Sequence, residues 1–196
     1  QCAEPLPEGD AQLDLPGRGV PLMMINSQWD FFPARGTPRK PDSATAEDMS
    51  VQWELAGSHH GWKWQYMYGD ARQEDLGRAG MLEWGEWQPW TCEPGRIEVP
   101  LYMAEKAMYE AMIDWVEQGI VPPSAPLIDT GADGAVAYDA NGTATGGLRF
   151  PMIAVPVASY GEGQALLSEG CPEIEPFPAE RLAELYGDRE SYLQRY

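Results

Sequence analysis

The sequence predicts an α/β fold, and three of its stretches carry that prediction. Residues 20–26 form a short continuous apolar run, whose length suits a strand buried on both faces of a parallel sheet. Residues 51–57, which Gly57 closes, form a second candidate strand. Polar side chains follow each run, as they do where a site forms at the carboxyl ends of parallel strands. Residues 101–118 repeat their apolar residues at helical steps.

The helix predicted over residues 101–118 has clear ends. Pro100 stands just before it and Gly119 just after it, and two further prolines at 122 and 123 forbid continuation. The methionines at helical spacing are most simply core residues. The apolar residues that recur at three- and four-residue steps are Ala104, Met108, Ala111, Met112, Trp115 and Val116.

Residues 127–160 are expected to form short extended pieces. A hairpin is predicted around Asn141-Gly142, and we prefer this turn to the alternative that Asn141 is a glycosylation acceptor. Pro151 and Pro156 cannot donate to a sheet ladder, so their segment is predicted to be an edge strand or an extended cover.

The remaining segments follow from local composition. The opening residues 1–19 are rich in proline, glycine and acids and are expected to be loop, and residues 33–50 are polar and proline-rich. From Pro178 the tail predicts two short amphipathic helices, separated at Gly187-Asp188.

Composition and charge limit the classes of partner. The 196 residues are 43% hydrophobic, enough for one domain with a core. The net charge of −18 repels phosphate backbones and anionic membrane surfaces, so neither nucleic acid nor membrane is an expected partner. The chain starts at Gln1 without a signal peptide or an initiator Met, which favours a processed N-terminus and a secreted or periplasmic protein.

The cysteines and histidines give little support to a metal site. Cys2, Cys92 and Cys171 are an odd number, and both a disulfide and three reduced thiols stay open. No zinc spacing occurs, and adjacent histidines rarely chelate one tetrahedral ion, so we expect no metal and no cofactor.

Residues 61–92 are dense in aromatic side chains without a clean period. The simpler interpretation is a loop-rich layer packed on the core. The functional interpretation is the wall of a pocket for an apolar or ring-bearing ligand. The candidate substrate-binding residues are Trp29, Trp62 and Trp64.

The candidate catalytic residues follow the two predicted strands. Asp30 comes after the first strand, and His59 and His60 come after the second. In a Ser-His-Asp triad, a carboxylate orients the imidazole that acts as the base. α/β-Hydrolases complete their triad in the order strand, Asp, strand, His. No G-x-S-x-G elbow occurs in the sequence, so a nucleophilic serine is expected upstream of Gln1.

Short blocks in a fixed order along nearly the whole chain carry a family resemblance. They are PLMMINSQWD (21–30), WELAGSHH (53–60), WVEQGIVPP (115–123), GGLRFP (146–151), VPVASY (155–160), Pro176-Phe177 and Leu185-Tyr186-Gly187. Together they resemble the C-terminal part of the large bacterial and fungal alpha/beta hydrolase domain family, whose members are esterase-like.

The resemblance implies a role for the whole chain. Residues 1–196 would be the C-terminal portion of one α/β-hydrolase domain: the last strands of a mostly parallel sheet with helices and long loops, completed by an upstream segment or chain that supplies the nucleophilic serine. The W-E-x-A-G-x-x-H block of the family selects His60 as the base, with His59 as the alternative, and the acid falls on Asp30. The implied reaction is hydrolysis of a small-molecule carboxylic ester.

Two other interpretations compete with the esterase. An acidic, aromatic-rich subunit could bind another protein or a glycan without catalysis, and His59 and His60 could bind a metal together with nearby acids. Arg149 could pair with an acidic group of a substrate, but a structural ion pair is the favoured role for it.

Overall fold

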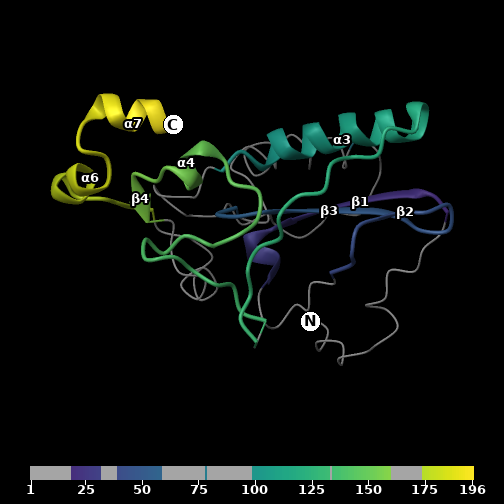
Figure 1. Ribbon diagram of the computed structural model, residues 1–196, viewed down its shortest axis with the longest axis horizontal. Coiled ribbons are helices and arrows are strands. Elements are labelled where there is room, and N and C mark those ends of the chain that lie inside the picture. Colours follow the sequence, from purple (N-terminus) through teal and green to yellow (C-terminus); the bar gives the residue numbers. More distant parts are fainter. Residues whose placement is uncertain (1–18, 32–38, 59–77, 79–98, 133, 160–173) are drawn as a thin grey trace.

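The computed structural model describes residues 19–31, 39–58, 78, 99–132, 134–159 and 174–196 (Figure 1). Within these residues a mixed sheet carries a long helix on one face, and short helices follow towards the C-terminus. The α/β class predicted from the sequence is confirmed in this coarse sense.

The sheet has three strands in the order β1-β3-β2. β1 (Pro21–Ser27) and β3 (Met49–Leu55) run parallel, with Met23 opposite Val51. The two-residue strand β2 (Ser43–Ala44) pairs antiparallel to β3, so the sheet is mixed. Both predicted strands are therefore confirmed, displaced by one or two residues.

The two faces of β3 are both buried, but they carry opposite chemistry. Val51, Trp53 and Leu55 belong to the hydrophobic clusters on the side of the long helix. The alternate residues Gln52 and Glu54, 1% and 0% exposed, point away from that side into polar contacts. A strand of alternating type is normally half-solvated. Here the chain covers its polar side as well.

β1 differs from the prediction that it is buried on both faces. Among its residues only Met23 and Ser27 are buried, and the others are intermediate. The reason is its place: within the described residues β1 is the outer strand and pairs only with β3.

The helix α3 (Leu101–Gln118) has the bounds that the sequence predicts, and Gly119 ends it in the left-handed conformation at φ 71°. It lies along one face of the sheet, where Trp115 and Met108 pack with Met23 and Trp53 (Figure 1).

Not every apolar residue of the helical pattern in α3 packs on the sheet. Val116 is 63% exposed and, with Tyr109 and Ile113, lies on the outer side of the helix. The spacing of 109, 113 and 116 is itself helical, so α3 carries apolar residues on two sides. Periodicity alone could not tell the two stripes apart.

The predicted hairpin around Asn141-Gly142 is confirmed. Asp139 and Thr143 bond across it, Gly142 adopts φ 71°, and the Asp139 carboxylate accepts from the backbone of Asn141 and Thr143. Tyr138 and Ala144, on either side of the turn, form an isolated antiparallel bridge, and a separate bridge joins Thr130 to Val136.

The segment with Pro151 and Pro156 differs from the predicted edge strand or extended cover. Pro151 begins a one-turn helix, α4 (Pro151–Ala154), because its fixed φ suits the first helical position. Ile153 of this turn is fully buried. Extended structure returns only at β4 (Ala158–Ser159), which pairs with β5 (Glu175–Pro176).

The two predicted C-terminal helices are confirmed as α6 (Ala179–Tyr186) and α7 (Arg189–Arg195), divided at Gly187. They lie away from the sheet (Figure 1), and neither has a buried residue. Polar contacts connect them to the rest: the Tyr186 hydroxyl donates to the Pro156 carbonyl at 2.6 Å, and Arg181 donates to Asn141 at 2.9 Å.

Candidate active site

The carboxyl ends of β1 and β3 lie side by side, and buried polar contacts join them. Ser27 pairs with Leu55 in the parallel register. The backbone N–H of Gly57 donates to the Gln28 side-chain oxygen at 2.6 Å, and the backbone N–H of Gln28 approaches the Ser58 hydroxyl at 3.3 Å. Gln28 and Ser58 are 5% and 3% exposed. Because both are buried, these bonds fix the start of each loop relative to the other.

Asp30 lies in the 3₁₀ turn η1 (Gln28–Phe31) that follows β1. Its Oδ2 accepts from the backbone N–H of Ser27 at 2.7 Å and from the Ser27 hydroxyl at 2.8 Å. These bonds turn the carboxylate back towards the end of the strand. A carboxylate held in this way is an ordered acceptor, which is what orienting an imidazole requires.

Several predicted site residues lie outside the described residues. His59, His60, Trp62 and Trp64 are among them, as are Cys2, Cys92 and Cys171. The backbone of Trp29 belongs to η1, but its side chain is not described. The structure does bring together two segments: the turn that carries Asp30, and Ser58, the residue directly before His59.

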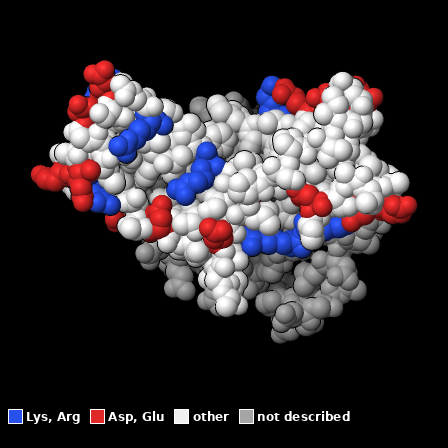
Figure 2. All heavy atoms as spheres, viewed as in Figure 1, with Lys and Arg blue, Asp and Glu red and all other residues white. Residues whose placement is uncertain are grey.

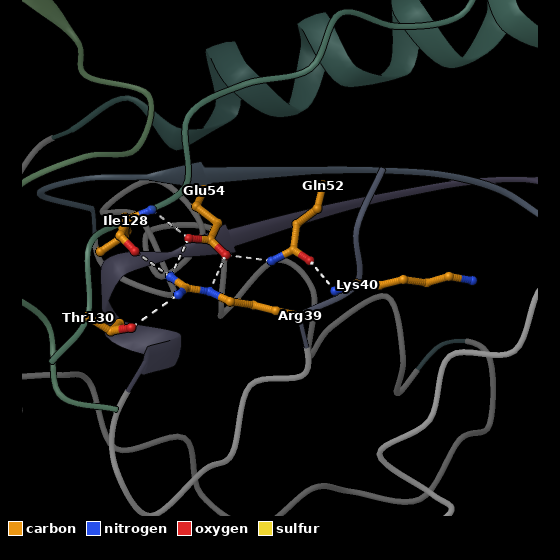
Figure 3. Close-up of polar contacts among 6 residues, drawn as sticks. All are labelled: Arg39, Lys40, Gln52, Glu54, Ile128 and Thr130. Carbon is orange, nitrogen blue, oxygen red and sulfur yellow. Dashed lines mark hydrogen bonds and ion pairs between the residues drawn. The ribbon is translucent and has the colours of Figure 1, made fainter. Parts of the chain in front are cut away.

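The sequence reasoning missed a buried charged cluster on the polar side of β3 (Figure 3). Glu54, fully buried, accepts two bonds from the Arg39 guanidinium, at 2.9 Å and 2.7 Å. Gln52 and the backbone N–H of Ile128 also donate to it. Arg39 donates in addition to the Ile128 carbonyl at 2.6 Å and to Thr130 at 3.2 Å.

The Arg39–Glu54 cluster stabilises the fold and offers no group to a substrate. Both oxygens of Glu54 are occupied by donors from the same chain, so neither is open to a substrate. The Arg39 guanidinium also lies over the ring of Phe31, 4.5 Å from the ring centroid, and Phe31 directly follows Asp30 in the sequence. The alternation of Gln52 and Glu54 with apolar residues in the sequence indicates a polar side of the strand. It does not indicate that Arg39 is the partner of Glu54.

A second feature missed from sequence is an apolar cleft of about 250 Å³ on the α3 side of the sheet. Its walls are Trp53, Leu55, Met103, Ala104, Leu148, Arg149 and Phe150. Arg149 donates to the Ile153 carbonyl at 2.9 Å and lies 3.6 Å from an Asp139 carboxylate oxygen. The favoured structural ion pair of Arg149 is therefore confirmed.

The described part of the chain lacks two kinds of feature. No group of three or more His, Cys, Asp or Glu there could hold a metal ion. No helix there is long and apolar enough to cross a membrane.

Comparison with known proteins gave one match. The model of the family described as "Alpha/beta hydrolase domain" matches residues 1–196. No curated protein and no solved structure matched the chain.

Proposed function

The chain belongs to the alpha/beta hydrolase domain family, and we propose that it is the C-terminal portion of a serine hydrolase that cleaves carboxylic esters. In this proposal Asp30 and His60 are the acid and the base of a Ser-His-Asp triad, and His59 is the alternative base. The nucleophilic serine lies on an upstream segment or chain, since residues 1–196 contain no G-x-S-x-G elbow.

The observation that carries the proposal is the junction at the ends of β1 and β3. Ser27 holds the Asp30 carboxylate, and Gln28 connects that turn to Gly57 and Ser58, where the histidine loop starts. In open α/β sheets, ligands bind in the crevice beyond the carboxyl ends of the strands. An ordered acid and a histidine loop at adjacent strand ends suit that kind of site.

The chemistry is acyl transfer to water. The serine oxygen attacks the ester carbonyl while His60 takes its proton, and His60 then returns the proton to the leaving alcohol. Water repeats the sequence on the acyl-enzyme and releases the acid. Asp30 holds the imidazole in the required tautomer and stabilises the imidazolium. Trp29, Trp62 and Trp64 are proposed to shape the substrate pocket.

Labelling with a serine-directed fluorophosphonate tests the class of enzyme. We expect a native preparation to take the label on the upstream segment or chain, and His60→Ala to abolish labelling while the fold is kept. His59→Ala is the matched control and should retain it. Absence of label from every chain of the preparation would overturn the esterase. A His60→Ala variant that changes stability but not labelling would favour a non-catalytic subunit.

Histidine titration by NMR tests the acid separately. Residues 1–196 contain two histidines, and the His59→Ala and His60→Ala variants identify their imidazole signals. A nearby carboxylate raises the pKa of a histidine, and Asp30→Asn should therefore lower one imidazole pKa by about one unit or more. Asp114→Asn, on the outer part of α3, is the control and should move neither. Two unmoved titrations in Asp30→Asn would remove Asp30 from the triad.

A further inference from the structure

We infer that the cleft between α3 and the Leu148–Phe150 segment binds a small apolar carboxylate. The proposed esterase would release an acid of this class, and only that link to the product depends on the proposed function. The binding itself follows from the walls of the cleft, as described next.

The shape and lining of the cleft select the apolar part of the ligand. The cleft is open to one side, and its lining is mainly carbon surface from two residues of β3, two of α3, and Leu148 and Phe150. The volume of about 250 Å³ is below the roughly 300–1,000 Å³ of sites for drug-sized molecules. A short acyl chain or a single ring therefore matches it better than a large molecule.

Arg149 is the one charged side chain in this wall, and it selects the ligand's head group. Its guanidinium is only partly occupied within the described residues. Nη2 carries the bond to Ile153 and the contact with Asp139, and Nε is buried and closed to a ligand, whereas Nη1 carries no hydrogen bond within the described residues. The side chain stays 26% exposed. A guanidinium nitrogen with donors to spare favours a carboxylate over an uncharged amide, because a hydrogen bond between charged groups is the stronger one.

The first turn of α3 adds to this preference. It supplies Met103 and Ala104 to the wall and contains no acidic residue. The partial positive charge at the start of the helix is therefore not opposed within that turn. The opposing charge is Asp139, which already approaches Arg149 at 3.6 Å and partly neutralises it.

The total charge of −18 opposes any anion at long range. At about 0.15 M salt, however, charges on the surface are screened beyond roughly 8 Å. The opposite charges of Arg149 and Asp139 then decide the affinity for an anion, and substitution of either residue alters it.

Titration with hexanoate and with its neutral amide, hexanamide, tests the inference. Binding is followed by NMR on the Met103 methyl group and by calorimetry, in the native preparation at 0.15 M salt. We expect hexanoate to bind more tightly than hexanamide. Arg149→Met should weaken hexanoate at least tenfold and leave hexanamide nearly unchanged, and Arg149→Lys should lie between.

The Asp139→Asn variant should change the affinity for hexanoate in the opposite direction to Arg149→Met. It keeps an oxygen to accept from Asn141 and Thr143 but removes the charge beside Arg149, so hexanoate should bind severalfold more tightly. Arg189→Met, on α7, is the control with no expected effect on binding. Thermal unfolding of each variant checks that the fold is kept.

The outcomes separate this inference from the proposed esterase. Equal affinity for hexanoate and hexanamide, or an Arg149→Met variant that binds hexanoate normally, would overturn the carboxylate site whatever the labelling shows. Absence of all binding would overturn it as well. Fluorophosphonate labelling needs none of these results and tests the esterase alone.

Discussion

The sheet with its covering segments and the C-terminal pair α6–α7 are held to the molecule in different ways. On the sheet, β3 is buried on both faces, and a fully buried glutamate connects it to Arg39 and to Ile128. The C-terminal pair has no buried residue and depends on exposed or part-buried contacts such as Arg181 with Glu184 and with Asn141. Figure 2 shows charged side chains over the C-terminal pair, further groups of them in the lower part of the view and at its upper right, and uncharged areas between.

The difference teaches where a polar contact affects stability. In a buried site, each unpaired group loses its solvation without replacement, so one deletion disrupts the whole cluster. At the surface, water replaces the lost partner. Similar bonds are therefore expected to contribute very differently to the free energy of unfolding in the two regions.

Removal of an arginine from each region should give the largest contrast. Arg39→Met leaves the Glu54 carboxylate buried without its counter-charge and should lower the free energy of unfolding by about 3–5 kcal/mol. Arg181→Met removes an exposed pair with Glu184 and should cost about 1 kcal/mol or less. Urea unfolding of both variants measures the difference. Equal losses would mean that the two regions do not differ as described.

Alanine at two glycines with positive φ should give the next contrast. Gly57 and Gly187 have φ of 72° and 77°. At Gly57 an added Cβ would lie 2.4 Å from Cδ1 of the fully buried Ile153, whereas at Gly187 it would meet nothing within 4 Å. Strain and overpacking together should cost about 2–4 kcal/mol for Gly57→Ala. Strain alone, at φ 77° and ψ −71°, should cost about 1–3 kcal/mol for Gly187→Ala, so the larger loss is expected at Gly57. If Gly57→Ala lowered the free energy of unfolding less than Gly187→Ala, the side chain of Ile153 would be able to move aside.

The hydroxyl of Tyr186 tests a single bond between the C-terminal pair and the rest. Burial raises the pKa of Tyr186, and the nearby Tyr192 raises it further. Tyr186→Phe removes the bond to the Pro156 carbonyl and should cost about 1 kcal/mol. Tyr192→Phe, which keeps that bond, is the control. Thermal unfolding measures both, and a neutral Tyr186→Phe would make this bond dispensable.

The start of α7 should give the smallest effect, and it should depend on pH. The backbone N–H of Ser191 donates to the Asp188 carboxylate and holds the pKa of Asp188 below its ordinary value of 3.8. A lowered pKa means that the capping contribution is complete above the unfolded value and is lost as pH falls through the folded value. Backbone NMR shifts of α7 should therefore move towards coil in strong acid.

Asp188→Asn is the matched variant for this cap. It keeps an oxygen acceptor but no longer titrates, so its α7 should not change in the same acid range. If α7 frayed equally in both proteins, protonation of Asp188 would not be the cause.

Local chemistry made some elements predictable and left others open. The helix at 101–118 has strong stop signals on both sides, and the Asn141-Gly142 turn has its own chemistry, so both were predicted. The one-turn helix at Pro151 was not, because four residues contain no period. For the candidate site, the sequence predicted Asp30 and the histidine loop at neighbouring strand ends. The roles of Gln28 and Ser58 in joining them did not follow from any pattern.

The sequence by itself determined the α/β class, the two parallel strands, the long helix and the family to which the chain belongs. Tertiary structure alone decided which apolar stripe of α3 faces the sheet, and that Glu54 pairs with Arg39, fifteen positions away. It also decided that Arg149 lines an apolar cleft. The physical reason is range: strand and helix periods are encoded between near neighbours, whereas the partner of a buried charge is selected only when distant segments pack together.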